Sequence, residues 1–349
     1  MTLKTWHLPM IGLLMITLIA GRAWGQTERV LHFAHTEGHQ NMSGISGMIR
    51  TISEIPAALS DAEKTLTLQG TPEQIALAEW LFVQLDTPPA PASNQPNSTV
   101  REYLLKGAGE NTVRVFFLAN TATVQDFQEA AAAIRAITEI RREFASYASR
   151  AIAARGTPDQ IALAAWMVDV LDRAAGEKAA SREHRMPESS DPHGEVVTRA
   201  FYVSNATTIQ DFQEIAGSVR AMAEIRRTFT VNAYRVIFAR STPEALDLAD
   251  WLIQQVDKPA IGKPGAPAVQ SSDAYGYTTT FDADTTVKVL YLPQIATVQD
   301  FQAFAARIRS TTNMRRTFAY SAPRAIAVRG TVDQIEMAER MAQGLDSPK

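Results

Sequence analysis

The chain has 349 residues, of which 46% are hydrophobic and 20% are charged, so it can bury sizeable cores and is not a disordered chain. Its formal net charge of -3 gives no overall attraction to nucleic acid or to an anionic membrane. The absence of cysteine excludes disulfides, thiol catalysis and a lipid anchor on an N-terminal cysteine.

Residues 1–25 have the features of a secretory signal peptide. Lys4 provides positive charge, and an apolar run follows from Met10 to Ala20. Ala23 and Gly25 then place small residues where a signal peptidase cleaves. The apolar run is short for a bilayer span, which favours cleavage before Gln26 over an uncleaved anchor. No later stretch is long and apolar enough to cross a membrane, so we expect a periplasmic or secreted chain without a stable transmembrane segment in its mature form.

The rest of the chain repeats one unit. Three stretches share a five-residue string, valine or isoleucine followed by Gln-Asp-Phe-Gln, at residues 124–128, 209–213 and 298–302. An arginine pair begins fourteen residues after each phenylalanine, namely Arg141 and Arg142, Arg226 and Arg227, and Arg315 and Arg316. A degenerate copy precedes these three, since residues 49–55 match residues 134–140 but the arginine pair is missing. Self-similarity of this kind identifies a repeat protein.

These landmarks divide the chain into copies and linkers. The predicted order is signal peptide 1–25, degenerate copy 27–86, Pro-rich linker 87–111, second copy 112–173, polar linker 174–197, third copy 198–258, flexible linker 259–286 and fourth copy 287–348. The linkers are rich in polar, Pro, Gly and Ser residues and bury little apolar surface. We therefore expect independent modules on flexible connections, because a tightly stacked solenoid does not tolerate such spacers.

Within a copy the predicted order is strand, helix, strand, strand, helix. The second copy opens with an apolar, aromatic run at Val113–Leu118, which is typical of a strand. Thr123, three residues before Asp126, then predicts a helix start with an N-cap hydroxyl and an acid in the first turn. Apolar residues at helical spacing follow and predict one buried stripe.

The second half of each copy continues with two strands and a helix. Ile140, Arg142 and Phe144 alternate with residues of the opposite face, which predicts a strand. The third strand, such as Val236–Ala239, is apolar throughout and is expected to be covered on both faces. Thr157–Gln160 combines an N-cap threonine with proline at the first helical position. The chain is thus predicted to be α+β, with four small βαββα modules, each a three-stranded sheet with two helices.

This order, with the string Arg-Gly-Thr-Pro-Asp-Gln-Ile at residues 155–161 followed by Leu171 and Asp172, resembles the KH-like N-domains of bacterial secretins and related ring-building modules of secretion systems. The resemblance implies a periplasmic location and a role in subunit packing or partner docking. A secretin also carries a long C-terminal barrel domain, which does not follow the fourth copy here. The resemblance therefore implies an accessory protein or a free-standing user of the module rather than an outer-membrane pore.

Two recurring sets of residues are candidate partner-binding sites. The arginine pairs are suited to an acidic peptide or a phosphate, or to ion pairs with nearby acids such as Glu139 and Glu224. Three tryptophans share one position of the last helix, at which the fourth copy has Arg340, and they are Trp80, Trp166 and Trp251. They either pack at the edge of their own core or anchor a neighbouring module.

The first copy also contains a histidine cluster. His32, His35 and His39 lie close in sequence to Glu37, which makes a metal-binding protein or a metal-dependent hydrolase the alternative function. The corresponding positions of the other copies hold no histidine, which favours an ordinary structural role.

Other catalytic patterns are missing from the sequence. It has no Ser-His-Asp constellation, no Walker loop, no dinucleotide glycine pattern and no Gly-x-x-Gly loop of nucleic-acid-binding KH modules. The prediction is a non-enzymatic, exported repeat scaffold that mediates protein–protein interaction or self-association in the cell envelope, with no cofactor and no nucleic-acid partner.

Overall fold

The computed structural model describes residues 27–87, 102–173, 182–260, 262–265, 271–276 and 286–344. In these ranges the chain forms eight α-helices and four small antiparallel sheets, which confirms the predicted α+β class. None of the described helices combines the length and the apolar character needed to cross a bilayer. The predicted signal peptide, the cleavage site before Gln26 and parts of the predicted linkers lie outside the described residues.

We call each sheet with its two helices a segment and number the segments along the chain. Segment 1 contains β1 (Thr27–His32), α1 (His39–Ser53), β2 (Ala57–Ser60), β3 (Thr65–Gly70) and α2 (Pro72–Leu85). Segment 2 contains β4 (Glu102–Leu104), β5 (Thr112–Phe117), α3 (Val124–Thr138), β6 (Arg142–Ser146), β7 (Ala151–Gly156) and α4 (Pro158–Leu171). Segment 3 contains β8 (Glu183–Arg185), a 3-10 turn (Glu188–Ser190), β9 (Val197–Tyr202), α5 (Ile209–Met222), β10 (Arg227–Val231), β11 (Val236–Ser241) and α6 (Pro243–Val256). Segment 4 contains β12 (Tyr275–Gly276), β13 (Thr286–Tyr291), α7 (Val298–Thr312), β14 (Arg316–Tyr320), β15 (Ala325–Gly330) and α8 (Val332–Gln343).

Local hydrogen bonds explain where the helices begin. The Thr123 hydroxyl accepts a bond from the Asp126 amide at 3.1 Å, and the Asp126 carboxylate accepts one from the Thr123 amide at 3.1 Å. This reciprocal cap satisfies two of the amides that a helix start leaves without partners. The second helix uses the predicted device, because the Thr157 hydroxyl accepts from the Gln160 amide at 3.2 Å and Pro158 occupies the first turn.

Segments 2, 3 and 4 each have a fourth strand that the sequence analysis assigned to a linker. The strands β4, β8 and β12 pair antiparallel with the first long strand of their own segment. They contain three, three and two residues, which is too short to show the alternation by which a strand is recognised in sequence. The described parts of the linkers are therefore partly built into the sheets.

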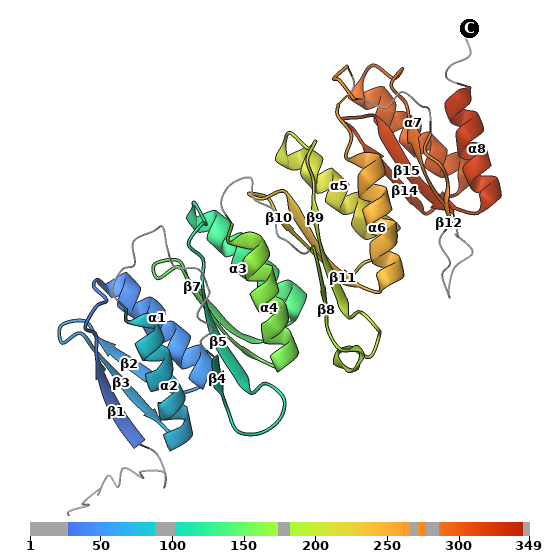
Figure 1. Ribbon diagram of the computed structural model, residues 1–349. Helices are drawn as coiled ribbons and strands as arrows, with labels where there is room; N and C mark the ends of the chain where they lie inside the picture. The colour runs from blue at the N-terminus through green and yellow to red at the C-terminus, as the bar shows by residue number, and fades with distance from the viewer. Residues whose placement is uncertain are drawn as a thin grey trace, which may run out of the picture.

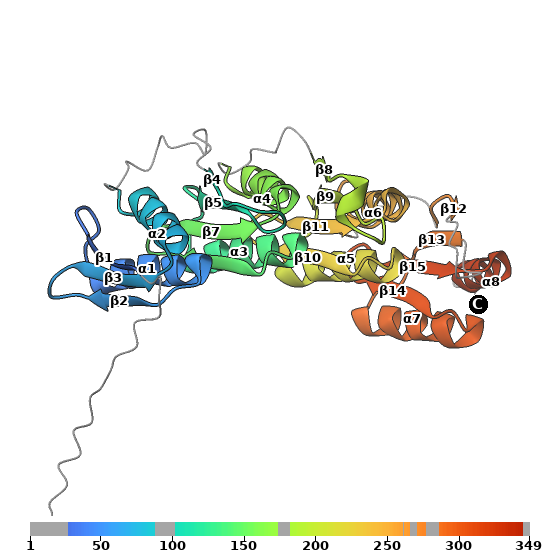
Figure 2. The ribbon, with the colours of Figure 1, turned by 90° about the horizontal axis from the view of Figure 1, so that it is seen from below.

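The segments stack face to face. Along the long axis, sheets and helix pairs alternate, so that the helices of one segment lie between their own sheet and the next sheet (Figures 1 and 2). In this arrangement α1 packs against β6, α3 against β10 and α5 against β14. The expectation of independent modules was therefore wrong for the described residues. The physical reason is that an apolar outer sheet face needs a cover, whatever the composition of the linker.

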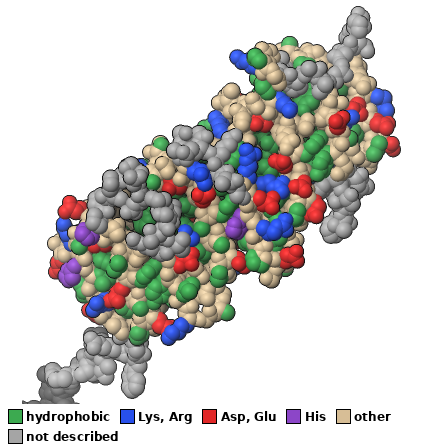
Figure 3. Space-filling model, in the orientation of Figure 1, with side chains coloured by type: hydrophobic (Ala, Val, Ile, Leu, Met, Phe, Trp, Pro, Cys, Tyr) green, Lys and Arg blue, Asp and Glu red, His purple; other side chains and the backbone are tan. Residues whose placement is uncertain are grey.

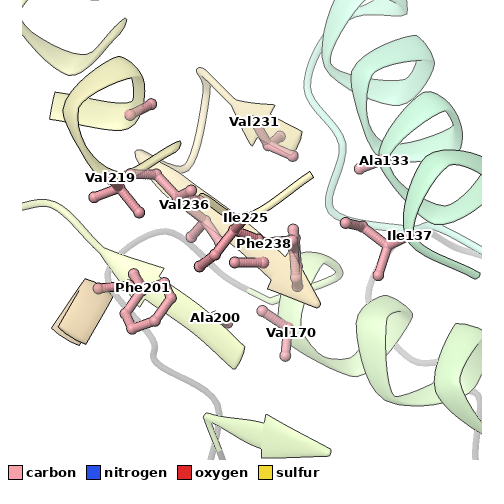
Figure 4. Close-up of a cluster of buried hydrophobic side chains, with 14 of the residues drawn as sticks. Ala133, Ile137, Val170, Ala200, Phe201, Val219, Ile225, Val231, Val236 and Phe238 are labelled. Atoms are coloured by element: carbon pink, nitrogen blue, oxygen red, sulfur yellow. The ribbon is translucent and has the colours of Figure 1, made fainter. Parts of the chain in front are cut away.

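The central strand of each sheet shows why the stack forms. All six residues of β11 are buried, which confirms the prediction that its continuously apolar sequence is covered on both faces. Ile137 of α3 and Val170 of α4 point toward Phe238 on one face of the strand, whereas Phe201 and Val219 lie on the other (Figure 4). Each of these five side chains is at most 3% exposed. One apolar core consequently continues from segment 2 into segments 3 and 4.

Candidate functional site

The junction between segments 1 and 2 holds a glutamate between two arginines. Glu54 follows the last turn of α1 in the left-handed conformation, with φ of 56°. Its carboxylate lies 2.8 Å from Arg142 Nε and accepts from Arg155 Nη1 at 3.3 Å, and both arginines belong to segment 2. The hydrogen bond with Glu54 raises the pKa of Arg142 above its ordinary value. We call this arrangement the glutamate clamp.

The clamp recurs at the other two junctions. Glu139 and Glu224 also have positive φ, at 58° and 55°. Glu139 lies 3.0 Å from Arg227 Nε and 3.6 Å from Arg240 Nη1. Glu224 contacts Arg316 and lies 3.4 Å from Arg329 Nη1. Each glutamate is therefore bound by the arginines of the following segment, whereas the sequence analysis paired Glu139 and Glu224 with the arginines beside them.

Strand register explains why a carboxylate is needed in the clamp. The two arginines of each clamp lie directly opposite each other on neighbouring strands, as Arg142 and Arg155 do on β6 and β7. Like charges in this position repel each other and destabilise the sheet. Acids of the same segment also pair with these arginines in segments 2 and 3, as Glu110 does with Arg142 and Asp191 with Arg240. The glutamate adds two ion pairs, and its place in the preceding segment makes those two pairs a contact between segments.

The third-strand arginine of each clamp also binds the end of the preceding helix. Arg155, Arg240 and Arg329 donate to the carbonyl oxygens of Ile52, Ile137 and Met222, at 3.5, 3.2 and 2.5 Å. A cation suits the C-terminus of a helix, where carbonyl groups lack intrahelical partners. Arg240 is 4% exposed and Arg329 is fully buried, so these cations depend on the groups around them for stabilisation.

The arginine pairs thus divide into two classes. The second arginine of each pair, Arg142, Arg227 or Arg316, is a clamp residue. The first arginine of each pair, Arg141, Arg226 or Arg315, is exposed. Arg226 lies 3.4 Å from Glu195 with 72% of its side chain exposed. That the exposed arginines bind a partner protein stays a prediction.

Aromatic residues fill the space beside the clamps. Phe144 of β6 lies so close to α1 that a Cβ atom on Gly47 would come within 2.6 Å of its Cζ atom. Gly217 of α5 has the same position, and a Cβ atom there would lie 3.2 Å from Phe318 Cε2. Glycine at this position lets helix and sheet of successive segments approach closely.

The three tryptophans contact the following segment. Trp80 lies 5.5 Å from Tyr103, Trp166 lies 5.9 Å from His184, and Trp251 lies 5.1 Å from Tyr275, measured between ring centroids. Tyr103, His184 and Tyr275 belong to the added strands β4, β8 and β12. That these tryptophans anchor a neighbouring module stays a prediction. Arg340, at the equivalent position of α8, instead pairs with Glu336 at 3.6 Å with 64% of its side chain exposed.

Replacing Trp251 by arginine, the residue that segment 4 has at this position, is expected to release β12. An aromatic pair contributes about 0.5–1.5 kcal/mol beyond its buried area, so the free energy of unfolding should fall by about 1–2 kcal/mol. Hydrogen exchange should speed up at Tyr275 and Gly276. Arg340→Trp, at the equivalent and exposed position of α8, is the matched control and should leave exchange in segment 4 unchanged.

The two ends of the stack have polar surfaces. On the outer face of sheet 1, Glu28 and His32 stand at the register positions that Val113 and Phe117 occupy in segment 2, and both are exposed. At the other end, Arg307 and Thr311 are exposed on α7. The equivalent residues of α3, Ala133 and Ile137, are fully buried. Asn313 replaces the clamp glutamate. Polar substitution of this kind terminates a repeat array.

The histidine cluster is dispersed in the structure. His32 lies on the outer sheet face, the His35 amide donates to Asp86 at 3.1 Å, and His39 Nδ1 lies 2.5 Å from Asp61 Oδ2. Glu37 lies 3.4 Å from Lys64. Over the part of the chain that the structure describes, no group of three or more His, Cys, Asp or Glu residues is arranged to hold a metal ion. The predicted metal alternative is therefore not supported.

Glu143 is a buried acid that the sequence analysis did not single out. Its residue is 4% exposed, and neither carboxylate oxygen has a hydrogen-bond partner among the described residues. Arg135 Nη2 is 3.7 Å away. Burial raises the pKa of Glu143 from 4.5 to about 7, and the charge of Arg135 opposes this rise only in part. The sequence could have indicated this acid, because segments 3 and 4 have a threonine at the same position, Thr228 and Thr317.

Glu143 should make stability depend on pH. Because its folded-state pKa lies above the ordinary value, the folded state favours the protonated form, and stability falls as pH rises from about 4.5 through about 7. Between pH 5 and pH 8 this effect should lower the free energy of unfolding by about 2–3 kcal/mol, and we expect Glu143→Gln to abolish that decrease. Urea unfolding at pH 5 and pH 8 measures this decrease. If the variant showed the same decrease as the unmodified protein, Glu143 would not be its source. Glu336→Gln, at an exposed site, is the control.

Comparison with known proteins gives matches to solved structures alone. No protein-family model and no curated protein sequence matches the chain. The chain is similar to ExeD of Aeromonas hydrophila, with 10% identity over 68% of this chain and 42% of that chain and a TM-score of 0.16. It thus spans less than half of the ExeD chain. It is also similar to the N-terminal domain of the secretin XcpQ from Pseudomonas aeruginosa, with 10% identity over 67% of this chain and all of that chain and a TM-score of 0.22.

A third similar structure is the pilotin–secretin AspS–GspD complex of ETEC, with 12% identity over 67% of this chain and 38% of that chain and a TM-score of 0.17. The last two of these structures contain secretins by name, the family whose N-domains the sequence resembles.

Proposed function

We propose that the chain is an exported, non-enzymatic scaffold that holds protein partners in the cell envelope. In this proposal the four segments are copies of one module, at residues 27–86, 112–173, 198–258 and 287–348, and they act together as one rod. The observation that carries the proposal is the glutamate clamp, because the same three residues join every pair of neighbouring segments. A rod of fixed length suits a protein that sets the spacing between partners.

The surface supports contacts along the sides of the rod. Both ends are polar, and the faces between segments are buried. On the face seen in Figure 3, basic and acidic side chains lie close to one another among apolar ones. Arg141, Arg226 and Arg315 recur once in each of segments 2 to 4. We propose these exposed arginines as contact points for acidic groups of a partner.

Export is tested by locating the protein and sequencing its N-terminus. We expect the chain in the periplasmic or secreted fraction with Gln26 as its first residue. Gly25→Arg should block cleavage, because the peptidase requires a small residue there, and Gly276→Arg, at an exposed position with open space around it, is a control outside the cleavage region. A chain that stays in the cytoplasm with Met1 intact would contradict export.

Partner contact is tested by photo-cross-linking in cells. A photoreactive amino acid at position 141, 226 or 315 should give adducts with a distinct protein, whereas one at position 137, buried inside the stack, should not. If no position on the sides of the rod gave an adduct, the scaffold proposal would fail.

A further inference from the structure

The first long strand of each segment is β1, β5, β9 or β13, and one edge of this strand faces away from the three-stranded core of its sheet. In segments 2, 3 and 4 a short antiparallel strand covers this edge, as β4 covers β5, β8 covers β9 and β12 covers β13. In segment 1 the equivalent strand is β1, and the sheet order is β1-β3-β2 with β1 outermost. Among the described residues, β1 is therefore the one of these four long strands that has no covering strand.

The backbone groups that make this pairing can be identified from the occupied edges. The Ala200 amide of β9 donates to the Arg182 carbonyl at 2.8 Å, and the Val289 carbonyl of β13 accepts from the Ser272 amide at 2.8 Å. Val30 has the same register position in β1, opposite Thr67. Its amide and carbonyl therefore point to the open edge, where an incoming strand can bind them.

The side chain next to Val30 shows what kind of strand fits. In segments 2 and 3 the covering strand places a glutamate directly opposite a basic residue, as Glu102 opposite Arg114 and Glu183 opposite Arg199. The pairs measure 3.3 and 2.7 Å, and the arginine side chains are 13% and 18% exposed. Arg29 has this position in β1, and its side chain is 58% exposed. It contacts Glu79 of α2 at 2.5 Å, on its own segment.

In the proposed mature chain, the stretch ahead of β1 is too short to supply the missing strand. The strand β4 ends at Leu104 and β5 begins at Thr112, so the covering strand returns through a connection of several residues. Cleavage before Gln26 leaves a single residue ahead of Thr27. This step rests on the export proposal, under which the mature chain has an uncovered edge on β1.

In segments 2 and 4 the opposite edge of the sheet, β6 or β14, is less suited to a partner strand. Arg135 Nη2 donates to the carbonyl oxygen of Glu143 on β6 at 3.1 Å, and Arg309 Nη2 donates to that of Thr317 on β14 at 2.6 Å. Edge carbonyls that a basic side chain already binds are protected against added strands. The structure describes no such donor to the β1 backbone.

We infer that the β1 edge of the mature chain binds an extended segment of a partner protein as a fourth, antiparallel strand, with an acidic residue opposite Arg29. The occupied edges of segments 2 to 4 are the template for this complex. The partner strand needs about three paired residues and a glutamate or aspartate at its first paired position.

Peptide binding to residues 26–349 tests this inference. The probe is a fluorescent peptide with the sequence Arg-Glu-Tyr-Leu-Leu, that of residues 101–105, followed by fluorescence anisotropy. We expect saturable binding that weakens at least tenfold when lysine replaces its glutamate. Arg29→Glu should reverse this preference. Val30→Pro, which removes the outward amide without touching the β1–β3 ladder, should abolish binding, and Val30→Thr should retain it. Circular dichroism verifies that each variant is folded.

A covalently attached strand tests the same binding even if the free peptide binds weakly. Residues 101–111 are grafted ahead of Thr27, which raises the effective concentration of the strand to the millimolar range. We expect slower hydrogen exchange of the Val30 amide in this graft and not in the graft with lysine at the glutamate position. Two results would overturn the inference. One is no protection of Val30 in either format, and the other is a dimer in light scattering that Val30→Pro dissociates, since the edge would then bind a second copy. Both experiments use purified protein, so their failure is separate from a failure of export.

Discussion

Replacing Glu224 by asparagine should separate segment 4 from segment 3. Arg329 is fully buried, and removing the carboxylate from a buried ion pair destabilises a protein by about 3–5 kcal/mol. Because the Glu224 side chain is 47% exposed, we expect a loss of about 3 kcal/mol, at the lower end of that range. Asparagine tolerates the left-handed conformation and occupies it at position 313 with φ of 54°, so the loss reports on the clamp and not on backbone strain.

Urea unfolding combined with hydrogen exchange measures this effect. The amides of α5 that face segment 4 should exchange faster in Glu224→Asn, whereas those of α1 should not change. Asn313→Glu makes the reverse exchange at the equivalent, exposed position after α7 and should change stability by less than about 0.5 kcal/mol. A double-mutant cycle with Arg316→Ala should be non-additive. Fully additive losses would mean that the two side chains act independently and that the clamp contributes nothing.

Replacing Phe238 by alanine should loosen segment 3 from segment 2. Phe238 is fully buried, faces Ile137 of α3 (Figure 4) and lies 5.9 Å from Trp166 between ring centroids. Removing a buried phenylalanine side chain lowers the free energy of unfolding by about 3–5 kcal/mol. Part of this loss weakens the contact between segments 2 and 3, so the fluorescence of Trp166 should shift toward that of an exposed tryptophan.

Phe201→Ala is the matched control for Phe238→Ala. Phe201 lies on the neighbouring strand of the same sheet and packs near Val219, toward the helices of its own segment (Figure 4). Both variants should lose similar stability in segment 3. Faster hydrogen exchange at the C-terminal end of α3 is expected for Phe238→Ala alone. If both variants affected α3 equally, the two faces of the sheet would not have the separate roles described above.

Local features of the fold could be predicted from the sequence because their causes are local. Thr123 and Asp126, or Thr157 and Gln160, stabilise a helix start through bonds between residues three apart. The apolar run of β11 also predicted a cover on both faces. The three added strands could not be predicted, because β12 has only two residues and each strand lies against a tryptophan of the preceding segment.

The sequence analysis named some residues of the clamp and none of its connections between segments. Arg227 and Glu139 were both singled out, but the sequence analysis paired each acid with its neighbours along the chain. In the structure Glu139 binds Arg227 and Arg240 of the following segment. Partners that lie one repeat apart appear only when the segments are stacked, and the composition of the linkers argued against stacking. The role of Glu139 as the left-handed residue that ends α3 was equally invisible, since glutamate does not favour that conformation.

Small-angle X-ray scattering on monomeric residues 26–349 tests the central claim most directly. We expect the profile of one elongated, rigid particle that matches the stack of Figure 1, and a shift toward a flexible chain for Glu224→Asn. A profile of independent globular units on flexible connections in the unmodified protein would contradict the stack, and with it the clamp and the scaffold proposal.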